Sequence, residues 1–392
     1  MEGIKMLKTM RWFGQKDPIS LRELRQAGCE GIVSALHHIP VGEVWSIEAI
    51  EEHRQLISDA GLQWMVVESL PVHEDIKQGK GNRLEFIENY KQSIRNLAVC
   101  GIHVITYNFM PVLDWIRTDH QYRNPDGSLT LSFDPMAFAT FDLHLLKRPG
   151  AHESYSEHEQ HAAAAYAESL SENQKKQLFQ NILLGLPGSS VNFTPEQLLK
   201  LLDGYSGIDE TAFRKNLVNF LEAVVPVAEE EGSKLAIHPD DPPFSLLGLP
   251  RIMSTMDDAD KIFNAVPSVS NGLCFCSGSL GAHEENDLPA ILDAFEDRVH
   301  FIHLRNVLKS GNRNFRESPH LDGDNPMEKI IEKILLIMQK RNIALPVRPD
   351  HGFLFEAEIH KDAYPGYSLM GRMKGLAEIT GLERGILFKL NQ

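Results

Sequence analysis

Four residues of metal-binding type each close a short apolar stretch of the chain. They are His238, Cys276, His303 and Asp350. Two imidazoles, a thiolate and a carboxylate suit a borderline divalent ion such as zinc, iron or manganese. The thiolate argues against a purely magnesium site, because Mg²⁺ prefers an all-oxygen octahedron. We therefore predict one metal site from these four side chains, with positions left open for substrate oxygens.

Cys274 is an alternative source of the thiolate. It lies two residues before Cys276 and therefore points to the same side of a strand. It would lie deeper in the fold, so we expect it to be a core residue, although its substitution as a ligand stays open.

The residues after Asp350 are of the acid–base type. His351 follows the predicted ligand directly and projects in a different direction, which suits a group that moves a proton of a metal-bound substrate. Tyr367 is the alternative, and which residue acts as base or acid stays open.

Further polar residues follow other apolar stretches and are expected to contact a substrate. We predict that one set binds the hydroxyl groups of a polyol, namely His37, Glu68, His73, Tyr107 and Asn108. Three arginines are candidates to hold a substrate carboxylate through paired hydrogen bonds, and the sequence does not rank them: Arg305, Arg348 and Arg372.

Eight apolar runs rich in β-branched residues must position these side chains. The runs are Gly31–Leu36, Trp64–Glu68, Val104–Phe109, Leu235–His238, Ile252–Thr255, Leu273–Cys276, Val299–Leu304 and Pro346–Arg348. Segments of helical periodicity lie between them, best seen at Ile47–Asp59, Leu84–Cys100, Asn216–Glu231 and Met327–Arg341. Eight alternating β and α segments predict an α/β fold, a (β/α)8 TIM barrel, whose catalytic groups lie at the carboxyl ends of the strands.

The regular spacing breaks once. Roughly 125 residues separate the third and fourth runs, far more than one β/α unit needs. We interpret residues 111–215 as a long helical insertion after strand 3 within a single domain spanning 1–392. It contains a predicted helix at Glu157–Ser169 and a segment marked by proline and glycine at Gly185–Pro195. A lid or a dimer contact is the expected role, and we predict a homodimer.

Composition excludes several classes of protein. The chain has 392 residues, of which 42% are hydrophobic and 24% charged, as in an ordinary globular protein. Its formal net charge of −15 disfavours nucleic acid and anionic membrane surfaces as partners. Four cysteines without a C-x-x-C pattern, and no long apolar run, lead us to expect a cytoplasmic protein without a membrane segment.

The order of several motifs resembles that of the mannonate dehydratase family almost from end to end. The stretches that carry the resemblance are Arg11–Gly14 (RWFG), Ala35–Pro40 (ALHHIP), Val67–Lys77 (VESLPVHEDIK), Tyr107–Trp115 (YNFMPVLDW), His238–Pro243 (HPDDPP) and Arg372–Glu378 (RMKGLAE). The resemblance implies a xylose-isomerase-like barrel, a divalent ion that is usually Mn²⁺ or Fe²⁺, and conversion of D-mannonate to 2-keto-3-deoxy-D-gluconate in hexuronate catabolism. The family's ligands fall on the same four residues: His238, Cys276, His303 and Asp350.

Three other functions remain as alternatives. A metal-dependent sugar isomerase or epimerase would use the same barrel, but often places several carboxylates on the metal. An endonuclease would need a basic groove, against which the net charge speaks. In a non-catalytic sugar-acid binding protein, the histidines and cysteines would be structural.

Overall fold

Eight parallel strands close into a barrel in the computed structural model, which describes residues 4–184 and 194–390. The order around the barrel is β1-β12-β9-β8-β7-β4-β3-β2. The strands are β1 (Leu7–Arg11), β2 (Gly31–Ser34), β3 (Gln63–Val67), β4 (Val104–Tyr107), β7 (Lys234–Ile237), β8 (Asn271–Cys276), β9 (Val299–Leu304) and β12 (Pro346–Pro349). The predicted (β/α)8 barrel is confirmed.

One of the eight predicted runs is wrong, and one strand was not predicted. Ile252–Thr255 is not a strand, because its backbone bonds to side chains instead of a neighbouring strand: Met253 N donates to Asp240 Oδ2 at 2.7 Å. The first strand, Leu7–Arg11, carries a lysine and an arginine in five residues and therefore lacks an apolar signal. Its Lys8 is neutralised by Glu383 of α14, with Nζ and Oε2 3.1 Å apart.

Helices surround the barrel where the sequence periodicity predicts them. The larger ones are α2 (Ile47–Asp59), α4 (Arg83–Val99), α9 (Glu210–Glu230), α10 (Met256–Ala265), α12 (Leu288–Ala294), α13 (Met327–Arg341) and α14 (Leu369–Leu390). The short ones are α1 (Leu21–Gln26), α3 (Glu74–Gln78), α11 (Ser277–Gly281) and η3 (Glu356–Lys361). Helix α9 begins earlier than predicted, because the Asp209 side chain accepts the Ala212 N–H and caps it.

Residues 111–215 follow β4, the fourth barrel strand, and not the third as predicted, since β1 was missed in the count. The segment holds β5 (Asp119–Arg123), β6 (Leu129–Phe133), α5 (Pro135–Thr140), η1 (Phe141–Leu146), η2 (Ala151–Ser154), α6 (Glu157–Ser169), α7 (Glu172–Leu183) and α8 (Pro195–Asp203). The predicted helix at Glu157–Ser169 is confirmed, whereas most of Gly185–Pro195 is outside the described residues. Two strands in this segment were not predicted.

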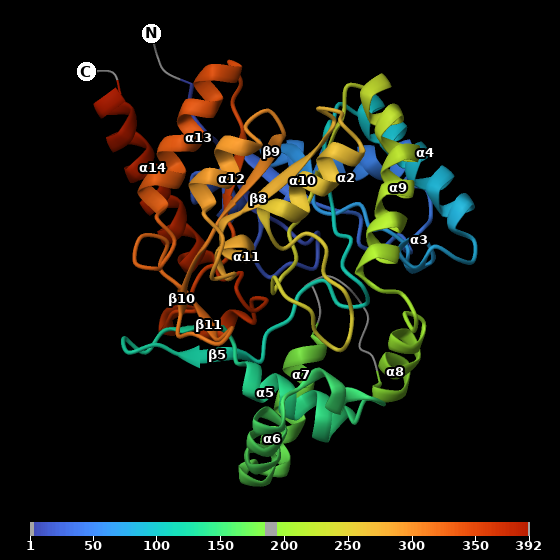
Figure 1. The fold of residues 1–392 in the computed structure, drawn as a ribbon. Coiled ribbons are helices and arrows are strands. Elements are labelled where there is room, and N and C mark those ends of the chain that lie inside the picture. Colours follow the sequence, from blue (N-terminus) through green and yellow to red (C-terminus); the bar gives the residue numbers. More distant parts are fainter. Residues whose placement is uncertain (1–3, 185–193, 391–392) are drawn as a thin grey trace.

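A second, antiparallel sheet covers one end of the barrel. Strands β10 (Asn306–Lys309) and β11 (Phe315–Ser318) combine with β6 and β5 in the order β10-β11-β6-β5. Because β10 begins two residues after β9 ends, this sheet lies at the carboxyl ends of the barrel strands. Figure 1 shows β5, β10 and β11 at the same end of the molecule as α5, α6 and α7, away from the two termini.

The barrel interior is closed by a small apolar layer below the carboxyl ends. It contains Val33, Val66, Ala236, Cys274 and Phe301, all fully buried. This layer lies between the polar carboxyl ends of the strands and the opposite end of the barrel. Among the described residues, no helix is long and apolar enough to cross a membrane.

Candidate active site and metal centre

A narrow pocket opens at the carboxyl ends of the barrel strands. It is lined by Arg11, Phe13, Glu68, Ser69, Asn108, Met110, Asp114, Trp115, His238, Asp241, Arg305, Arg348, Asp350, His351 and Tyr367. Most of the lining comes from the ends of barrel strands or the loops that follow them. Asn108, Met110, Asp114 and Trp115 come from the segment between β4 and β5. This is the end of a (β/α)8 barrel at which catalytic groups gather.

The four predicted ligands lie close to one another, and two of them, His238 and Asp350, line this pocket. Ligand atoms of Cys276, His303 and Asp350 lie within 4.8 Å of one another. His238 Nε2 is 3.2 Å from His303 Nδ1, which is 3.8 Å from Asp350 Oδ1. His238 Nδ1 is 2.7 Å from the Pro239 carbonyl, so in a neutral ring this nitrogen carries the proton and Nε2 presents a lone pair. Lone pairs that converge in this way fit a cation.

Cys274 forms a second group with His238 and His303, and it approaches His303 from the other side. Its Sγ is 3.4 Å from His303 Nε2, whereas the other nitrogen faces His238 and Asp350. Burial in the apolar layer raises the pKa of the Cys274 thiol well above its usual range, which disfavours the thiolate that a metal needs. Cys276 instead receives the Ser279 N–H at 3.4 Å and its hydroxyl at 3.2 Å. Cys276 Sγ also lies 3.7 Å from Asp350 Oδ2, so this sulfur is next to a second predicted ligand.

Asp350 is held as a carboxylate by two arginines. Arg348 Nη1 lies 2.7 Å from Oδ1, and Arg305 Nη1 lies 3.0 Å from Oδ2. Burial alone would raise the pKa of Asp350, but Arg348, His351 and Arg305 hold it well below its usual range. The carboxylate is therefore charged and fixed in orientation before any ligand arrives.

His351 is oriented by a buried carboxylate that the sequence did not reveal. Its Nδ1 is 2.7 Å from Glu317 Oε1, and only 5% of its side chain is exposed. Burial would raise the pKa of Glu317, but His351, Arg305 and Arg117 lower it. The Tyr367 ring packs edge-on against the imidazole with centroids 5.1 Å apart, and burial raises the pKa of Tyr367 to about 12. The structure thus places a histidine with a charged partner beside a phenol that keeps its proton.

Four of the residues predicted to contact the substrate line the pocket: Glu68, Asn108, Arg305 and Arg348. Glu68 accepts two hydrogen bonds from Arg348, at 2.8 and 3.1 Å. Asn108 Nδ2 donates to Asp114 Oδ2 at 3.2 Å. The two arginines bind carboxylates of the protein itself, so they shape the pocket through Glu68 and Asp350.

The other four lie outside the lining, and each has a different contact. His73 caps α3 and stacks on Phe86 with ring centroids 3.8 Å apart. The fully buried Tyr107 ring faces Phe220 of α9 on the helix side of the barrel. Arg372 donates a hydrogen bond to the Arg11 carbonyl at 2.7 Å and so stabilises the end of β1.

His37 is the fourth residue outside the lining, and it lies next to it. Its Nε2 is 3.0 Å from Arg11 Nη2, and its side chain is exposed.

Strand alternation explains why Tyr107 lies outside the pocket lining. The side chains of its neighbours along β4 point to the opposite face of the strand.

Several residues of the pocket were missed by sequence reasoning. Arg11 belongs to the strand that was not recognised, and Trp115 lies in a loop without periodicity. Asp241 stands in the HPDDPP stretch, where its two arginine partners, Arg117 and Arg305, are distant in sequence. Glu317 lies on β11, about which the sequence carries no signal. The one signal for Arg11 is its place at the start of the RWFG stretch, Arg11–Gly14.

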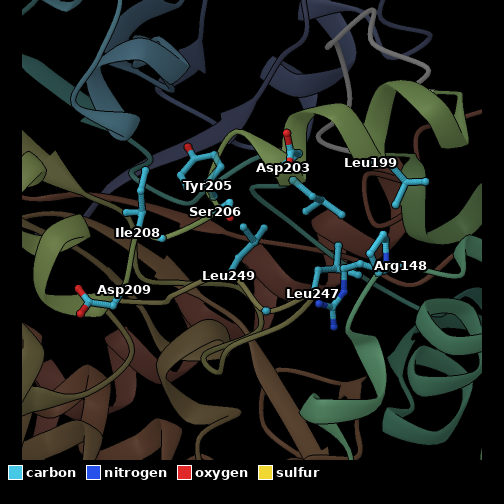
Figure 2. A pocket seen from close by; sticks show the side chains of 13 residues that line it. Arg148, Leu199, Asp203, Tyr205, Ser206, Ile208, Asp209, Leu247 and Leu249 are labelled. Atoms are coloured by element: carbon cyan, nitrogen blue, oxygen red, sulfur yellow. The ribbon is translucent and has the colours of Figure 1, made fainter.

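A wider hollow of about 550 Å³ lies elsewhere, between the loop after α8 and the segment after β7 (Figure 2). Figure 2 shows Leu199, Leu247 and Leu249 on its walls, with Asp203 and Asp209 at its edge. Among the residues that the structure describes, its lining holds no histidine or cysteine. We therefore place the chemistry in the narrow pocket and not in the wider one.

The fold is a (β/α)8 barrel with a group of potential metal ligands at the carboxyl ends of its strands. A xylose isomerase-like TIM barrel protein from Mycobacterium smegmatis in complex with magnesium has the same fold, with a TM-score of 0.53, 14% identity and coverage of 99% of this chain and 100% of that one. At this identity the likeness concerns the fold alone.

The chain belongs to the D-mannonate dehydratase (UxuA) family, whose model matches residues 6–390. It is 47% identical over 384 residues to a mannonate dehydratase of Saccharophagus degradans, covering 96% of this chain and 97% of that one. It is 48% identical over 387 residues to that of Marinomonas sp., covering 97% and 99%. The crystal structure of mannonate dehydratase from Streptococcus suis matches with a TM-score of 0.78 and 33% identity, over 100% of this chain and 96% of that one. The resemblance seen in the motifs is confirmed, and dehydration is favoured over the isomerase alternative.

Proposed function

We propose that the chain converts D-mannonate to 2-keto-3-deoxy-D-gluconate and water with one Mn²⁺ or Fe²⁺ ion held by His238, Cys276, His303 and Asp350. Two groups of possible ligands share His303, one with Cys276 and Asp350 and one with His238 and Cys274, and their position beside His351 at the carboxyl ends of the strands is the observation that carries the proposal. When bound, the ion polarises oxygens of the substrate and stabilises the negative charge that develops when the C2 proton is removed.

The charge of the pocket supports a divalent ion together with an anionic substrate. Among the described residues, the lining holds three arginines and four carboxylates, so with neutral histidines it is negative by one unit. The proposed Cys276 thiolate adds a second negative charge, and a divalent ion would offset both, which leaves the loaded site neutral. An aldonate carries a single negative charge, which the loaded site repels less than the site without its ion. A pocket that lacks the ion repels the same substrate.

His351 is the proposed base that takes the C2 proton, and Tyr367 is the proposed acid that protonates the departing C3 hydroxyl. Glu317 binds His351 Nδ1 at 2.7 Å, so Nε2 is the nitrogen left for proton transfer. Tyr367 keeps its proton because burial raises its pKa to about 12. The enol that results from loss of water tautomerises to the 2-keto product.

Turnover of D-mannonate by the purified protein tests this function. After chelation, the protein should form no 2-keto acid, and anaerobic addition of Mn²⁺ or Fe²⁺ should restore its formation. A chelated protein that retains full activity would contradict the proposal, as would a loaded protein that forms no keto acid.

Two further properties are proposals. A homodimer is supported by the commonness of twofold homo-oligomers, and sedimentation equilibrium would measure it. A cytoplasmic location is supported by the four cysteines, all of which are free thiols. Fractionation of the native cells would test the location.

A further inference from the structure

Arg11, at the carboxyl end of β1, has hydrogen-bond donors without an acceptor. Its side chain is 7% exposed and lines the pocket. Nε and Nη1 are buried and have no hydrogen-bond partner within residues 4–184 and 194–390. Only Nη2 has one, His37 Nε2 at 3.0 Å. A buried guanidinium with unused donors is costly, unless a ligand completes its hydrogen bonds.

The other two arginines of the pocket are already occupied by protein carboxylates. Arg348 directs its nitrogens at Glu68 and Asp350. Arg305 binds Asp241 at 2.6 Å and Asp350 at 3.0 Å. Its Nε also lacks a partner, but this nitrogen lies close against Gly278. Arg11 is thus the arginine of the lining whose donors remain for a substrate.

The carboxylate nearest to Arg11 leaves these donors free. Glu68 Oε2 is 3.8 Å from Arg11 Nη1, beyond hydrogen-bond length, while Glu68 accepts both of its short bonds from Arg348. The same oxygen is 3.4 Å from His303 Nε2. Glu68 is in turn bonded to Arg348, which binds the proposed ligand Asp350 at 2.7 Å, so the Arg11 guanidinium lines the same pocket as the proposed metal ligand Asp350.

We infer that Arg11 binds the carboxylate of the sugar-acid substrate, and that it is the residue by which the pocket selects an acid over the corresponding neutral polyol. The inference rests on the proposed function for the identity of the acid. The Phe13 ring covers the guanidinium at 4.9 Å and His37 holds one of its nitrogens, so the group is fixed before the substrate binds. An arginine held in this way supplies a charge-assisted hydrogen bond to an anion and little to a hydroxyl.

A matched pair of unreactive probes tests this inference. The first is 3-deoxy-D-arabino-hexonate, which lacks the leaving hydroxyl, and the second is the hexitol in which its carboxylate is replaced by CH₂OH. Their dissociation constants are measured by calorimetry on the Mn²⁺-loaded protein and on its Arg11→Met and Arg11→Lys variants. Arg123→Met removes an exposed arginine on β5 and serves as the charge-matched control.

Arg11→Met should weaken binding of the hexonate on the order of 10- to 100-fold and change that of the hexitol less than about twofold. Arg11→Lys should recover part of the loss, and Arg123→Met should change neither constant. Equal losses for both probes, or no loss for the hexonate, would overturn the inference. If Arg11→Met does not fold, the Arg11→Lys variant decides by the same comparison of the two probes.

The same measurements distinguish failure of the proposed function from failure of the Arg11 inference. Wild-type protein that binds the hexonate through Arg11 but forms no keto acid from D-mannonate would refute the dehydration and keep the carboxylate site. If the wild-type protein dehydrates D-mannonate while Arg11→Met binds both probes normally, the dehydration is kept and the carboxylate site is refuted.

Discussion

Replacement of His351 by asparagine separates proton transfer from metal binding. The imidazole has Nδ1 2.7 Å from Glu317, and its Nε2 is 3.9 Å from Asp350 Oδ1, so it lies beside the proposed ligands without being one of them. An asparagine amide still has a hydrogen to donate toward Glu317 but has no basic nitrogen. We expect His351→Asn to keep its metal content and to lower kcat roughly 10²- to 10⁴-fold, or about 3 to 5 kcal/mol in activation free energy.

The assay follows the C2 hydrogen directly. D-mannonate deuterated at C2 is incubated with each variant, and both loss of deuterium to solvent and formation of 2-keto acid are measured. His161→Asn, on the exposed face of α6, is the matched control and should behave as wild type. Wild-type rates of deuterium loss in His351→Asn would refute the base assignment and move it to Tyr367.

Three further predictions follow from the same contacts. Cys276→Ser should lower the bound Mn²⁺ measured by plasma emission spectroscopy about tenfold or more, because Cys276 Sγ lies 3.7 Å from the Asp350 carboxylate. Cys274→Ser should keep the ion, because burial raises the pKa of the Cys274 thiol well above its usual range. Equal losses would place both sulfurs at the metal. Glu317→Leu should lower kcat roughly 10- to 100-fold. Glu317→Gln should lower it much less, since the amide oxygen still accepts a hydrogen bond from His351. Equal kcat values for the two variants would contradict this role of Glu317. Glu383→Leu should lower the free energy of unfolding by about 3 to 5 kcal/mol in urea titration, because the buried carboxylate binds both Met6 N and Lys8; an unchanged midpoint would contradict it.

The metal group was accessible to sequence reasoning because its members sit at one repeated position. His238, Cys276, His303 and Asp350 each lie within one residue of the carboxyl end of a strand, and a parallel barrel brings all such positions to one rim. The structure brings the four together without any of them being adjacent in sequence. Local periodicity and this one rule of barrel topology were sufficient to predict the metal group.

The partners of that group were not accessible, since they depend on tertiary contacts that have no period. Glu317 reaches His351 only because β10 and β11 pair with β6 of the insertion. Tyr107 was expected in the pocket, but the alternation of β4 turns its ring toward α9, a fact that depends on strand register. Strand β1 was missed because Lys8 and Arg11 interrupt its apolar pattern, and the groups around them, Glu383 of α14 and the pocket, come from distant parts of the sequence.

Anomalous diffraction from a crystal of the protein grown with Mn²⁺ tests the central claim most directly. Data collected on the two sides of the manganese absorption edge should show one peak per chain, bounded by His238 Nε2, Cys276 Sγ, His303 Nδ1 and the Asp350 carboxylate. A peak on the other side of His303, against Cys274, would contradict the ligand set proposed here. The absence of any peak at the carboxyl ends of the strands would contradict the metal centre itself.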